Sequence, residues 1–289
     1  MSVTGTGTID DPFVVTTYDE LVEKSVLGSS SSPVYVKLGN DINILDEYPD
    51  GNMPQCTIAS NIDGNGKTIY NLYSITQSSF GIFILTFGSL KNIKIKNIYT
   101  HRPLFSSTSA ISSDRRFAFQ DCEFSGVCSD VFYKGSSYCA GFVRCTFNIK
   151  CNSCMTTSTY PPLFSSCYIK FSSTAIKLFQ FSNISTNSIE LMDSTYVEAN
   201  MPELVNISMN SDGSSGRDTS VCYDNSVLDI TTDAEFTIGY AVSARQRTIL
   251  RSSHAPNASG TANVTAVDET HWLDAEYLSS IGFNIEVSA

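Results

Sequence analysis

Two carboxylates near the middle of this sequence, Asp121 and Glu123, are the best candidates for acid–base chemistry. Asp114, Arg115 and Arg116 stand a few residues before them. Cleavage of a glycosidic bond requires one carboxylic acid that protonates the leaving group and a second carboxylate that acts as base or nucleophile, at separations of about 5 to 9.5 Å. Charges of this kind also recur wherever a strand ends in a turn, so we favour solvated turn charges over a catalytic site.

Cys151 and Cys154 indicate a second chemistry, because their C-x2-C spacing is that of half a zinc site. Cys145 and Cys167 could supply the third and fourth ligands. No second C-x2-C pair is present, and three of these four cysteines also belong to a repeat that explains them without a metal. We therefore expect no metal site and no cofactor.

The elements that must position these residues follow from a motif that returns through the middle of the chain every 22 to about 30 residues. In each copy a polar or small residue, a spacer and an apolar residue form the period-two pattern of a short strand with one buried face. Strand-only repeats of this length predict a β-solenoid, in which each strand lies on its counterpart in the next coil. The copies are Gln120-Asp121-Cys122-Glu123-Phe124, Val143-Arg144-Cys145-Thr146-Phe147, Ser166-Cys167-Tyr168-Ile169, Met192-Asp193-Ser194-Thr195-Tyr196 and Tyr223-Asp224-Asn225-Ser226-Val227.

Small residues at fixed places in the repeat predict two ladders that run along the stack, with successive members about 4.8 Å apart. The expected ladders are Cys122/Cys145/Cys167 and, six residues further along each coil, Cys128/Cys151/Ser173. Phenylalanines also recur with the coils, and we expect them to stack in the core rather than to bind sugars. They are Phe83, Phe105, Phe124, Phe147, Phe164 and Phe179.

The start of the chain predicts a cap for this solenoid. Residues 1–63 should contain a strand at 13–15, an amphipathic helix at 18–26 and a strand at 34–38. A helix ahead of the first coil covers an apolar end that would otherwise invite aggregation. The coils themselves should occupy residues 64–230.

Residues 231–289 differ in pattern and predict a C-terminal closing unit. Apolar residues alternate as a strand from Phe236 to Val242, a polar loop follows at 252–263, and Asp274 can cap a helical turn that ends at Gly282. There is no apolar run of about 18 residues, so we expect no membrane insertion.

Four segments resemble a known family. Gly5-Thr6-Gly7-Thr8, Asp11-Pro12-Phe13-Val14-Val15, Asp63-Gly64-Asn65-Gly66-Lys67-Thr68-Ile69 and Leu90-Lys91-Asn92-Ile93-Lys94-Ile95 are similar to the opening of right-handed parallel β-helix proteins of the pectate-lyase-like superfamily. Within that group the style is most similar to bacteriophage tailspikes and appendages. The resemblance covers roughly residues 5 to 230 as a pattern. It implies an all-β chain built as a single-stranded right-handed parallel β-helix, with an N-terminal cap helix and a C-terminal closing unit.

The resemblance also bears on catalysis. In lyases of this fold three acidic residues bind calcium beside a basic residue that abstracts a proton, and in its hydrolases paired aspartates work with a Gly-His-Gly element. Neither pattern occurs here, and His101, His254 and His271 lie outside such motifs. We therefore expect a non-enzymatic structural virion protein that docks on a phage particle and binds host surface glycans. The alternatives are a polysaccharide-degrading lyase or hydrolase and a host-glycan adhesin.

Charge is distributed unevenly along the chain, which points to partners. Residues 1–63 carry 2 basic and 10 acidic residues, 64–189 carry 12 and 4, and 190–289 carry 4 and 15. A basic middle between acidic ends indicates docking surfaces, although surface lysines also serve ordinary solubility. The first candidates for docking are Lys91, Lys94 and Lys96, and those for glycan contact are Tyr133, Tyr138 and Tyr160 in predicted loops. We expect other virion proteins and host polysaccharide as partners, with a trimer possible and no nucleic acid.

The first residues have neither a basic nor an apolar region, so we predict no secretory signal peptide. The nine cysteines, an odd number, favour buried reduced thiols over a disulfide framework. We therefore expect synthesis in a host cytoplasm and a place in the virion.

Overall fold

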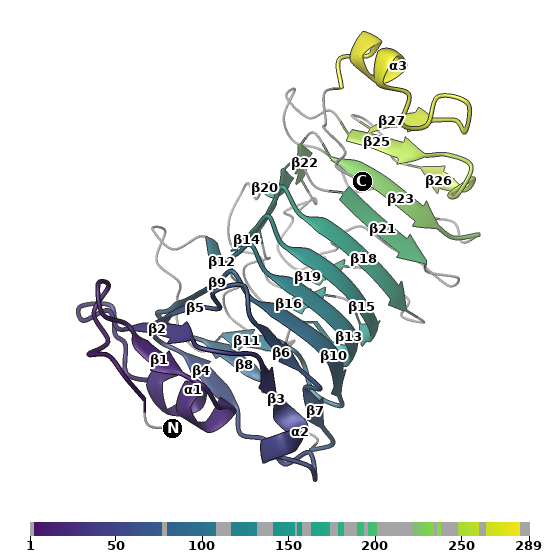
Figure 1. The fold of residues 1–289 in the computed structure, drawn as a ribbon. Coiled ribbons are helices and arrows are strands. Elements are labelled where there is room, and N and C mark those ends of the chain that lie inside the picture. The colour runs from purple at the N-terminus through teal and green to yellow at the C-terminus, as the bar shows by residue number, and fades with distance from the viewer. Residues whose placement is uncertain are drawn as a thin grey trace, which may run out of the picture.

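The computed structural model describes residues 3–76, 80–107, 117–131, 141–153, 155–157, 163–173, 179–181, 190–193, 196–200, 222–224, 226–233, 236–237, 248–259 and 264–283. Over these ranges the chain winds into a right-handed parallel β-helix, as Figure 1 shows. Every pair of neighbouring strands in its sheets is parallel. The predicted fold class is confirmed.

Two long sheets and one short sheet form the walls of the coils. The nine-stranded sheet contains, in spatial order, β1 (Phe13–Val15), β2 (Tyr35–Leu38), β5 (Asn61–Asp63), β9 (Ser89–Lys91), β12 (Phe117–Gln120), β14 (Gly141–Val143), β17 (Leu163–Ser165), β20 (Glu190–Asp193) and β22 (Cys222–Asp224). The three-stranded sheet contains β4 (Cys56–Ile58), β8 (Phe83–Leu85) and β11 (Phe105–Ser107). Strand order follows chain order in both, as expected when each coil adds one strand to each wall.

The eleven-stranded sheet is the longest wall. Its strands are β3 (Ile42–Asn43), β6 (Thr68–Tyr70), β10 (Lys94–Thr100), β13 (Glu123–Asp130), β15 (Thr146–Ser153), β18 (Tyr168–Ser173), β21 (Tyr196–Asn200), β23 (Val227–Thr231), β25 (Thr248–Arg251) and β27 (Val264–Val267), with β7 (Tyr73–Ser74) also paired to β10. Two further pairs of short strands form separate two-stranded sheets, β16 (Met155–Thr157) with β19 (Phe179–Phe181) and β24 (Phe236–Thr237) with β26 (Ala258–Ser259). The predicted polar loop at 252–263 therefore contains a short strand, and the predicted strand to Val242 is described only over β24.

A single residue turns the chain from the nine-stranded sheet into the eleven-stranded sheet. Asn92, Asp121, Arg144 and Ser166 occupy this corner in successive coils, with φ of 55°, 53°, 50° and 53°. This left-handed conformation suits Asn and Asp best among residues with a side chain. The recurring motif of the sequence is thus a corner residue, a small buried residue and the start of a strand.

Both predicted ladders are confirmed. Thr146 N donates to Cys122 O at 2.8 Å and Tyr168 N donates to Cys145 O at 3.0 Å, which places the first three cysteines on neighbouring rungs. In the second ladder Cys128 pairs in register with Cys151, and Cys151 with Ser173. The described cysteine side chains are free thiols, and all are buried.

Aromatic stacks fill the core between the walls. The rings of Phe119 and Phe142 stack at 4.7 Å between centroids, and those of Phe142 and Phe164 at 5.3 Å. Phe124 stacks on Phe147 at 5.1 Å. Each ring that is fully removed from water stabilises the fold by about 1.5 to 3 kcal/mol. The core positions predicted from the repeat are buried, namely Phe83, Phe105, Phe124, Phe147 and Phe164, whereas the side chain of Phe179 lies outside the described residues.

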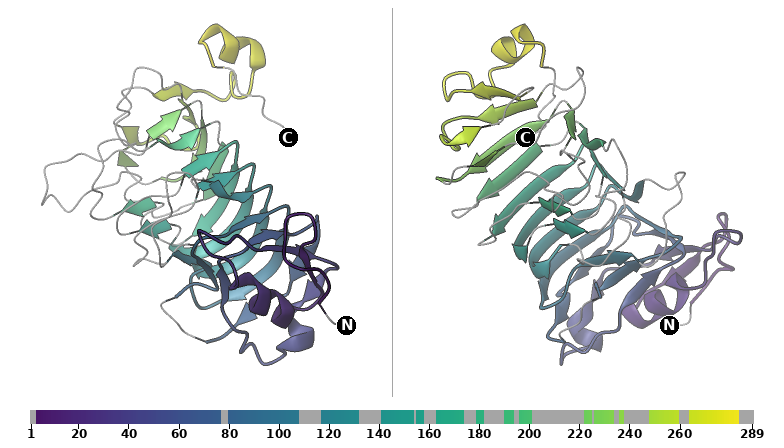
Figure 2. Two further views of the ribbon diagram at one scale, coloured as in Figure 1. Left: turned by 90° about the vertical axis from the view of Figure 1, so that its left-hand side faces the viewer. Right: turned by 180° about the vertical axis from the view of Figure 1, so that it is seen from behind.

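Helices lie toward both ends of the stack (Figure 2). The predicted N-terminal helix is α1 (Tyr18–Ser25), which Thr17 caps by accepting from Glu20 N. Its Tyr18 and Leu21 are buried in the main core. A second short helix, α2 (Ile44–Glu47), follows β3. Among the described residues no helix is long and apolar enough to cross a membrane.

At the C-terminal end the predicted helical turn is α3 (Ala275–Ser280), and Asp274 caps it as expected by accepting from Glu276 N and Tyr277 N. Leu278 and Phe283 pack with Val227 and Ile249 in a small apolar cluster of their own. Leu228 and Leu250, the neighbours of those two sheet residues, point into the main core. The C-terminal segment therefore packs on the outer face of the eleven-stranded sheet.

Candidate functional site

Asp121 is a corner residue whose carboxylate is held by the next coil. Arg144 Nε and Nη2 donate to its two oxygens at 2.7 and 2.8 Å. These hydrogen bonds hold the pKa of Asp121 below its usual value. Glu123 is paired as well, with Oε1 3.0 Å from Lys96 Nζ. Both predicted acid–base candidates are thus engaged in ion pairs between coils, and Asp114, Arg115 and Arg116 lie outside the described residues.

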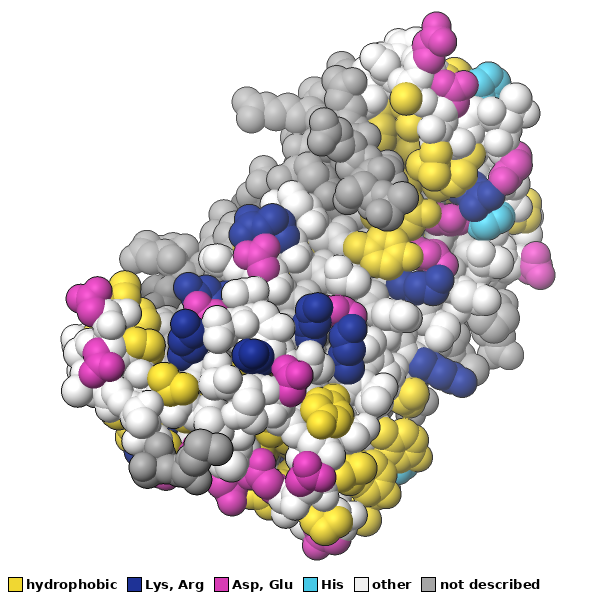
Figure 3. All heavy atoms as spheres, viewed as in Figure 1, with side chains coloured by type: hydrophobic (Ala, Val, Ile, Leu, Met, Phe, Trp, Pro, Cys, Tyr) yellow, Lys and Arg dark blue, Asp and Glu magenta, His cyan; other side chains and the backbone are white. Residues whose placement is uncertain are grey.

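The three lysines singled out for docking lie on or beside β9 and β10. Lys91 Nζ is 3.4 Å from Asp63 Oδ2, and Lys96 pairs with Glu123. Lys94 is exposed and, like Lys67, makes no ion pair within the described ranges. Figure 3 shows Lys and Arg side chains gathered over the middle of the β-helix, with a smaller number of acidic side chains between them and further acidic side chains toward its ends. A net basic face therefore exists at the predicted place, although two of its three named lysines are partly neutralised.

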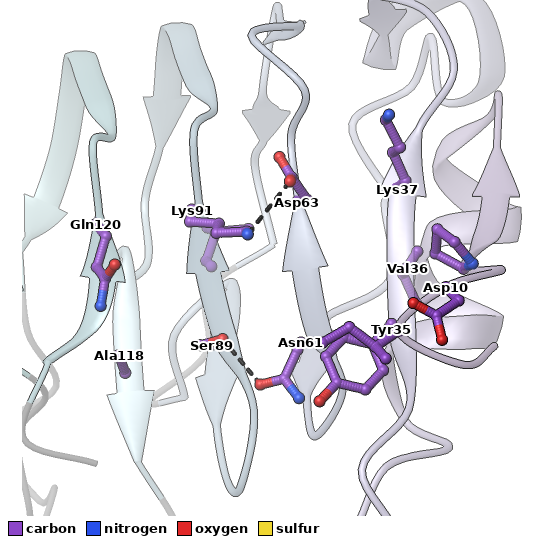
Figure 4. Close-up of a pocket in the computed structure, with 13 residues that line it drawn as sticks. Asp10, Tyr35, Val36, Lys37, Asn61, Asp63, Ser89, Lys91, Ala118 and Gln120 are labelled. Atoms are coloured by element: carbon purple, nitrogen blue, oxygen red, sulfur yellow. Dashed lines mark hydrogen bonds and ion pairs between the residues drawn. The ribbon is translucent and has the colours of Figure 1, made fainter.

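A polar cleft lies beside this face on the nine-stranded sheet, and Figure 4 shows its lining. Its floor has two rows of outward side chains in strand register. One row is Tyr35, Asn61 and Ser89, and the other is Lys37, Asp63, Lys91 and Gln120. One wall is the N-terminal arm, through Ile9, Asp10 and Pro12.

Glycines shape the arm that forms this wall. Gly7 O accepts from Tyr35 N at 2.9 Å, which ties the arm to β2. Gly5 and Gly7 have φ of 88° and 81°, and a Cβ on Gly5 would lie 2.1 Å from Pro12 O. Only glycine tolerates that approach. The Gly5-Thr6-Gly7-Thr8 motif thus has a local reason, because it folds the arm over the edge of the cleft.

The cleft is lined mainly by hydrogen-bonding groups and carries no net charge. It encloses about 580 Å³, within the range of sites for small ligands. Its lining includes two lysines, Lys37 and Lys91, and two aspartates, Asp10 and Asp63, so its charged side chains sum to zero. Ser89 Oγ donates to Asn61 Oδ1 at 2.9 Å, which leaves Asn61 Nδ2 without a partner among the described residues. Tyr35 adds a half-buried ring to the amide and hydroxyl groups.

The thiols do not form a described metal centre. Cys145, Cys151 and Cys167 occupy the two ladders, and the side chain of Cys154 lies outside the described residues. In the described part of the chain no group of three or more His, Cys, Asp or Glu side chains is arranged to hold a metal ion. The suggested glycan contacts Tyr133, Tyr138 and Tyr160 also lie outside the described residues.

A dense polar cluster that sequence reasoning missed lies on the outer face of β21, β23 and β25. Asp229, with a side chain only 9% exposed, is its centre. Its oxygens accept from Arg251 Nη1 at 3.0 Å and from Tyr196 OH at 3.2 Å, and His254 Nδ1 lies 2.6 Å away. Arg251 also pairs with Glu269 and lies over the ring of Trp272. The cluster therefore ties the C-terminal segment to the sheet.

A row of charges continues from this cluster toward the middle of the sheet. Glu198 accepts from Tyr168 OH and Lys170 Nζ, both at 2.6 Å. Burial raises the pKa of Glu198, but these two hydrogen bonds and the nearby charges of Lys170 and His254 together outweigh burial, so the net shift of the pKa is downward. The repeat could have predicted this row. Tyr168 and Tyr196 begin equivalent strands, and Lys170 and Glu198 each lie two residues after the tyrosine.

The fold and these surfaces define a right-handed parallel β-helix protein with a polar cleft and a basic face. No family model matches the sequence, and no curated protein matches it. Among solved structures, a crystal structure described as that of "a putative immunoglobulin A1 protease from Bacteroides ovatus" is similar at 13% sequence identity and a TM-score of 0.46. The match covers 92% of this chain and 82% of the other. At that level the likeness says nothing about the activity of this chain.

Proposed function

We propose that this protein acts by binding and assembly rather than by catalysis, as a structural protein of a phage particle that also binds surface glycans. The observation that carries the proposal is the state of the central carboxylates. Asp121 and Glu123 are both engaged by a cation of a neighbouring coil, whereas a general acid or base needs a free proton position within reach of its substrate.

Docking on a particle would use the basic face. Lys94 and Lys67 project from neighbouring coils without an ion pair among the described residues, and both sit on a rigid stack of strands. Lys94 is exposed and Lys67 is half-buried. Cations at a protein surface raise the rate and specificity of association with an acidic surface. The phage assignment itself is supported by the resemblance of the N-terminal segments to virion β-helix proteins.

Glycan binding would use the cleft. Its zero net charge and its amide, hydroxyl and tyrosine groups suit a neutral sugar chain better than a polyanion. The two rows of side chains repeat at the strand spacing of about 4.8 Å. An extended oligosaccharide that lies across the strands would meet a new polar group at each rung.

The decisive experiment separates a binder from a polysaccharide-degrading enzyme. Purified protein is incubated with surface polysaccharide of candidate hosts, and released reducing ends and unsaturated sugars are measured. We expect none, and we expect the double variant Asp121→Asn, Glu123→Gln to attach to particles as the wild type does. Depolymerisation by the wild type would overturn the proposal, and its loss in the double variant would identify the acid–base pair.

Binding is measured in the same series. Tyr35→Ala should abolish glycan binding, and Tyr168→Ala, an exposed tyrosine outside the cleft, is its matched control. Lys94→Glu should weaken attachment to particles and should reduce the dependence of that attachment on salt. Lys150→Glu, at an exposed lysine of β15 two strands away from β10, should have a smaller effect. Attachment that is unchanged by Lys94→Glu and indifferent to salt between about 0.05 and 0.5 M would exclude docking through the basic face.

A further inference from the structure

The N-terminal arm that forms one wall of the cleft is a closed turn. Gly7 N donates to Asp11 O at 2.9 Å, and Thr8 Oγ1 accepts from Asp11 N at 3.2 Å. Ile9 and Asp10 lie between the two tied residues, at the tip of the turn, and both line the cleft. Because the carbonyl of Gly7 also accepts from the backbone of β2, the tip has a fixed place beside that strand.

Two charged side chains at this end of the cleft have no partner in the part of the chain that the structure describes. The carboxylate of Asp10 and the ammonium group of Lys37 make neither a hydrogen bond nor an ion pair with a described residue. The other two charged residues of the lining, Asp63 and Lys91, pair with each other at 3.4 Å. Figure 4 shows Asp10 and Lys37 at the end formed by the arm and β2, with Gln120 at the other end. The arm end therefore offers one acceptor and one donor that the described protein does not use.

An exposed apolar side chain belongs to the same wall as the free carboxylate. Ile9 is 69% exposed, the largest fraction among the large hydrophobic residues that the structure describes. Pro12 adds a second apolar group to the lining. A single exposed isoleucine is ordinary on a protein surface, but this one lines a cleft next to an unused acceptor. A ligand that fits this end should present an apolar group as well as polar ones.

We propose that the cleft binds glycans built from N-acetylated amino sugars, and that the arm end holds the acetamido group. The amide N–H of that group donates to the carboxylate of Asp10, and its carbonyl oxygen accepts from Lys37 Nζ. Its methyl group covers Ile9. The inference rests on the proposed function, because it names the class of sugar that the same cleft takes.

The acetamido group suits these residues better than the other common substituents of sugars. A neutral amide pairs its donor with a carboxylate and its acceptor with an ammonium group, so both free charges gain a charge-assisted hydrogen bond and no charge is added. A hydroxyl has no methyl group to cover Ile9. The carboxylate of a uronic acid would meet Asp10 as a like charge, and a free amino group would meet Lys37 in the same way.

The test compares two trisaccharides that differ only in this group. Chitotriose carries an acetamido group at C2 of each ring, and cellotriose carries a hydroxyl there. Each is titrated into the full chain, and binding is followed by NMR. We expect chitotriose to bind at least about tenfold more tightly, because cellotriose leaves the methyl contact and part of the hydrogen bonding unmade.

Variants of the arm end locate the acetamido group in the cleft. Asp10→Ala, Lys37→Met and Ile9→Ser should each weaken chitotriose binding at least about threefold and leave cellotriose binding within about twofold of the wild type. Asp11→Ala is the matched control, because Asp11 is exposed, carries the same charge and does not line the cleft. Ile9 and Asp10 are exposed, so their variants should unfold at the temperature of the wild type.

The outcomes separate the inference from the proposed function. Equal affinity for the two trisaccharides, no binding of chitotriose, or equal effects of Asp10→Ala and Asp11→Ala would overturn the inference. If both trisaccharides bind equally and Tyr35→Ala abolishes both, the cleft is a glycan site without selectivity for acetamido groups, and only the inference fails. If host polysaccharide also fails to bind the wild type, the proposed glycan binding fails with it.

Discussion

Replacement of Asp229 by Asn tests whether the polar cluster on β21, β23 and β25 stabilises the C-terminal coils. The substitution keeps the volume of the side chain and one acceptor oxygen, but it removes the charge that Arg251 and His254 contact. Asp121→Asn is the matched comparison, because it breaks a carboxylate–arginine pair of better geometry at an exposed corner.

The two magnitudes differ because burial differs. The side chain of Asp229 is 9% exposed and that of Asp121 is 48% exposed. Breaking a buried pair costs about 3 to 5 kcal/mol, whereas an exposed pair contributes about 0.2 to 1 kcal/mol. Arg251 keeps Glu269 as a partner, so we expect a loss of about 2 to 3 kcal/mol for Asp229→Asn. Asp121→Asn should cost close to nothing, because Asn also suits the left-handed corner.

The single tryptophan of the chain provides the assay. Trp272 lies over Arg251, with the guanidinium carbon 5.4 Å from the ring centre, so its fluorescence reports the C-terminal segment directly. Urea titrations of wild type and both variants are followed at this signal, and the free energies of the transition are compared. An Asp229→Asn protein within about 0.5 kcal/mol of the wild type, or a larger loss for Asp121→Asn, would refute the role assigned to burial.

Two further predictions concern titration and thiol chemistry. Hydrogen bonds from Arg251 and Ser253 lower the pKa of Glu269 to about 2. Because the pKa of Glu269 is depressed in the folded state, the carboxylate contributes its full stabilisation above the usual glutamate pKa of about 4.3 and loses it as the pH falls toward 2. Trp272 fluorescence should therefore change between these two pH values in the wild type, and should change less in Glu269→Gln. Burial raises the pKa of Cys56 to about 11 and that of Cys128 well above its usual value. Peptide mapping should therefore find both thiols unlabelled by a thiol reagent at about pH 8 until the protein is unfolded. Rapid labelling of either thiol in the folded protein would contradict their buried positions.

Much of the architecture could be predicted because the repeat has a physical cause. Each coil needs a corner residue, a buried residue behind it and an apolar residue two places on. In three successive coils the buried residue is a cysteine, namely Cys122, Cys145 and Cys167, despite unequal coil lengths. The N-terminal helix and the helix cap at Asp274 could also be predicted, because the residues that indicate them lie within a few positions of each other in the sequence. Local signals and strict repeats are what a single sequence reveals.

The sites were harder to predict because they depend on register and burial. Glu198 and Asp229 lie 31 residues apart and become neighbours only when β21 and β23 are aligned. His254 comes from a segment that reads as a polar loop. Asp121 appeared chemically available in the sequence, and only the structure shows Arg144 on its carboxylate. No pattern in the sequence indicates that Arg102 is buried.

The single-residue corner also decides where this fold can change. From Asn92 to Asp121 the chain advances 29 residues, but from Asp121 to Arg144 only 23 and from Arg144 to Ser166 only 22. The difference is taken up entirely elsewhere in the coil, because the corner has no spare residue. One residue inserted after Asp121 would shift the following strand by one place and exchange its buried and exposed faces. Segments inserted into the other turns of the coil would leave the register of neighbouring strands unchanged. New recognition loops can therefore be added in those turns without a change in strand pairing.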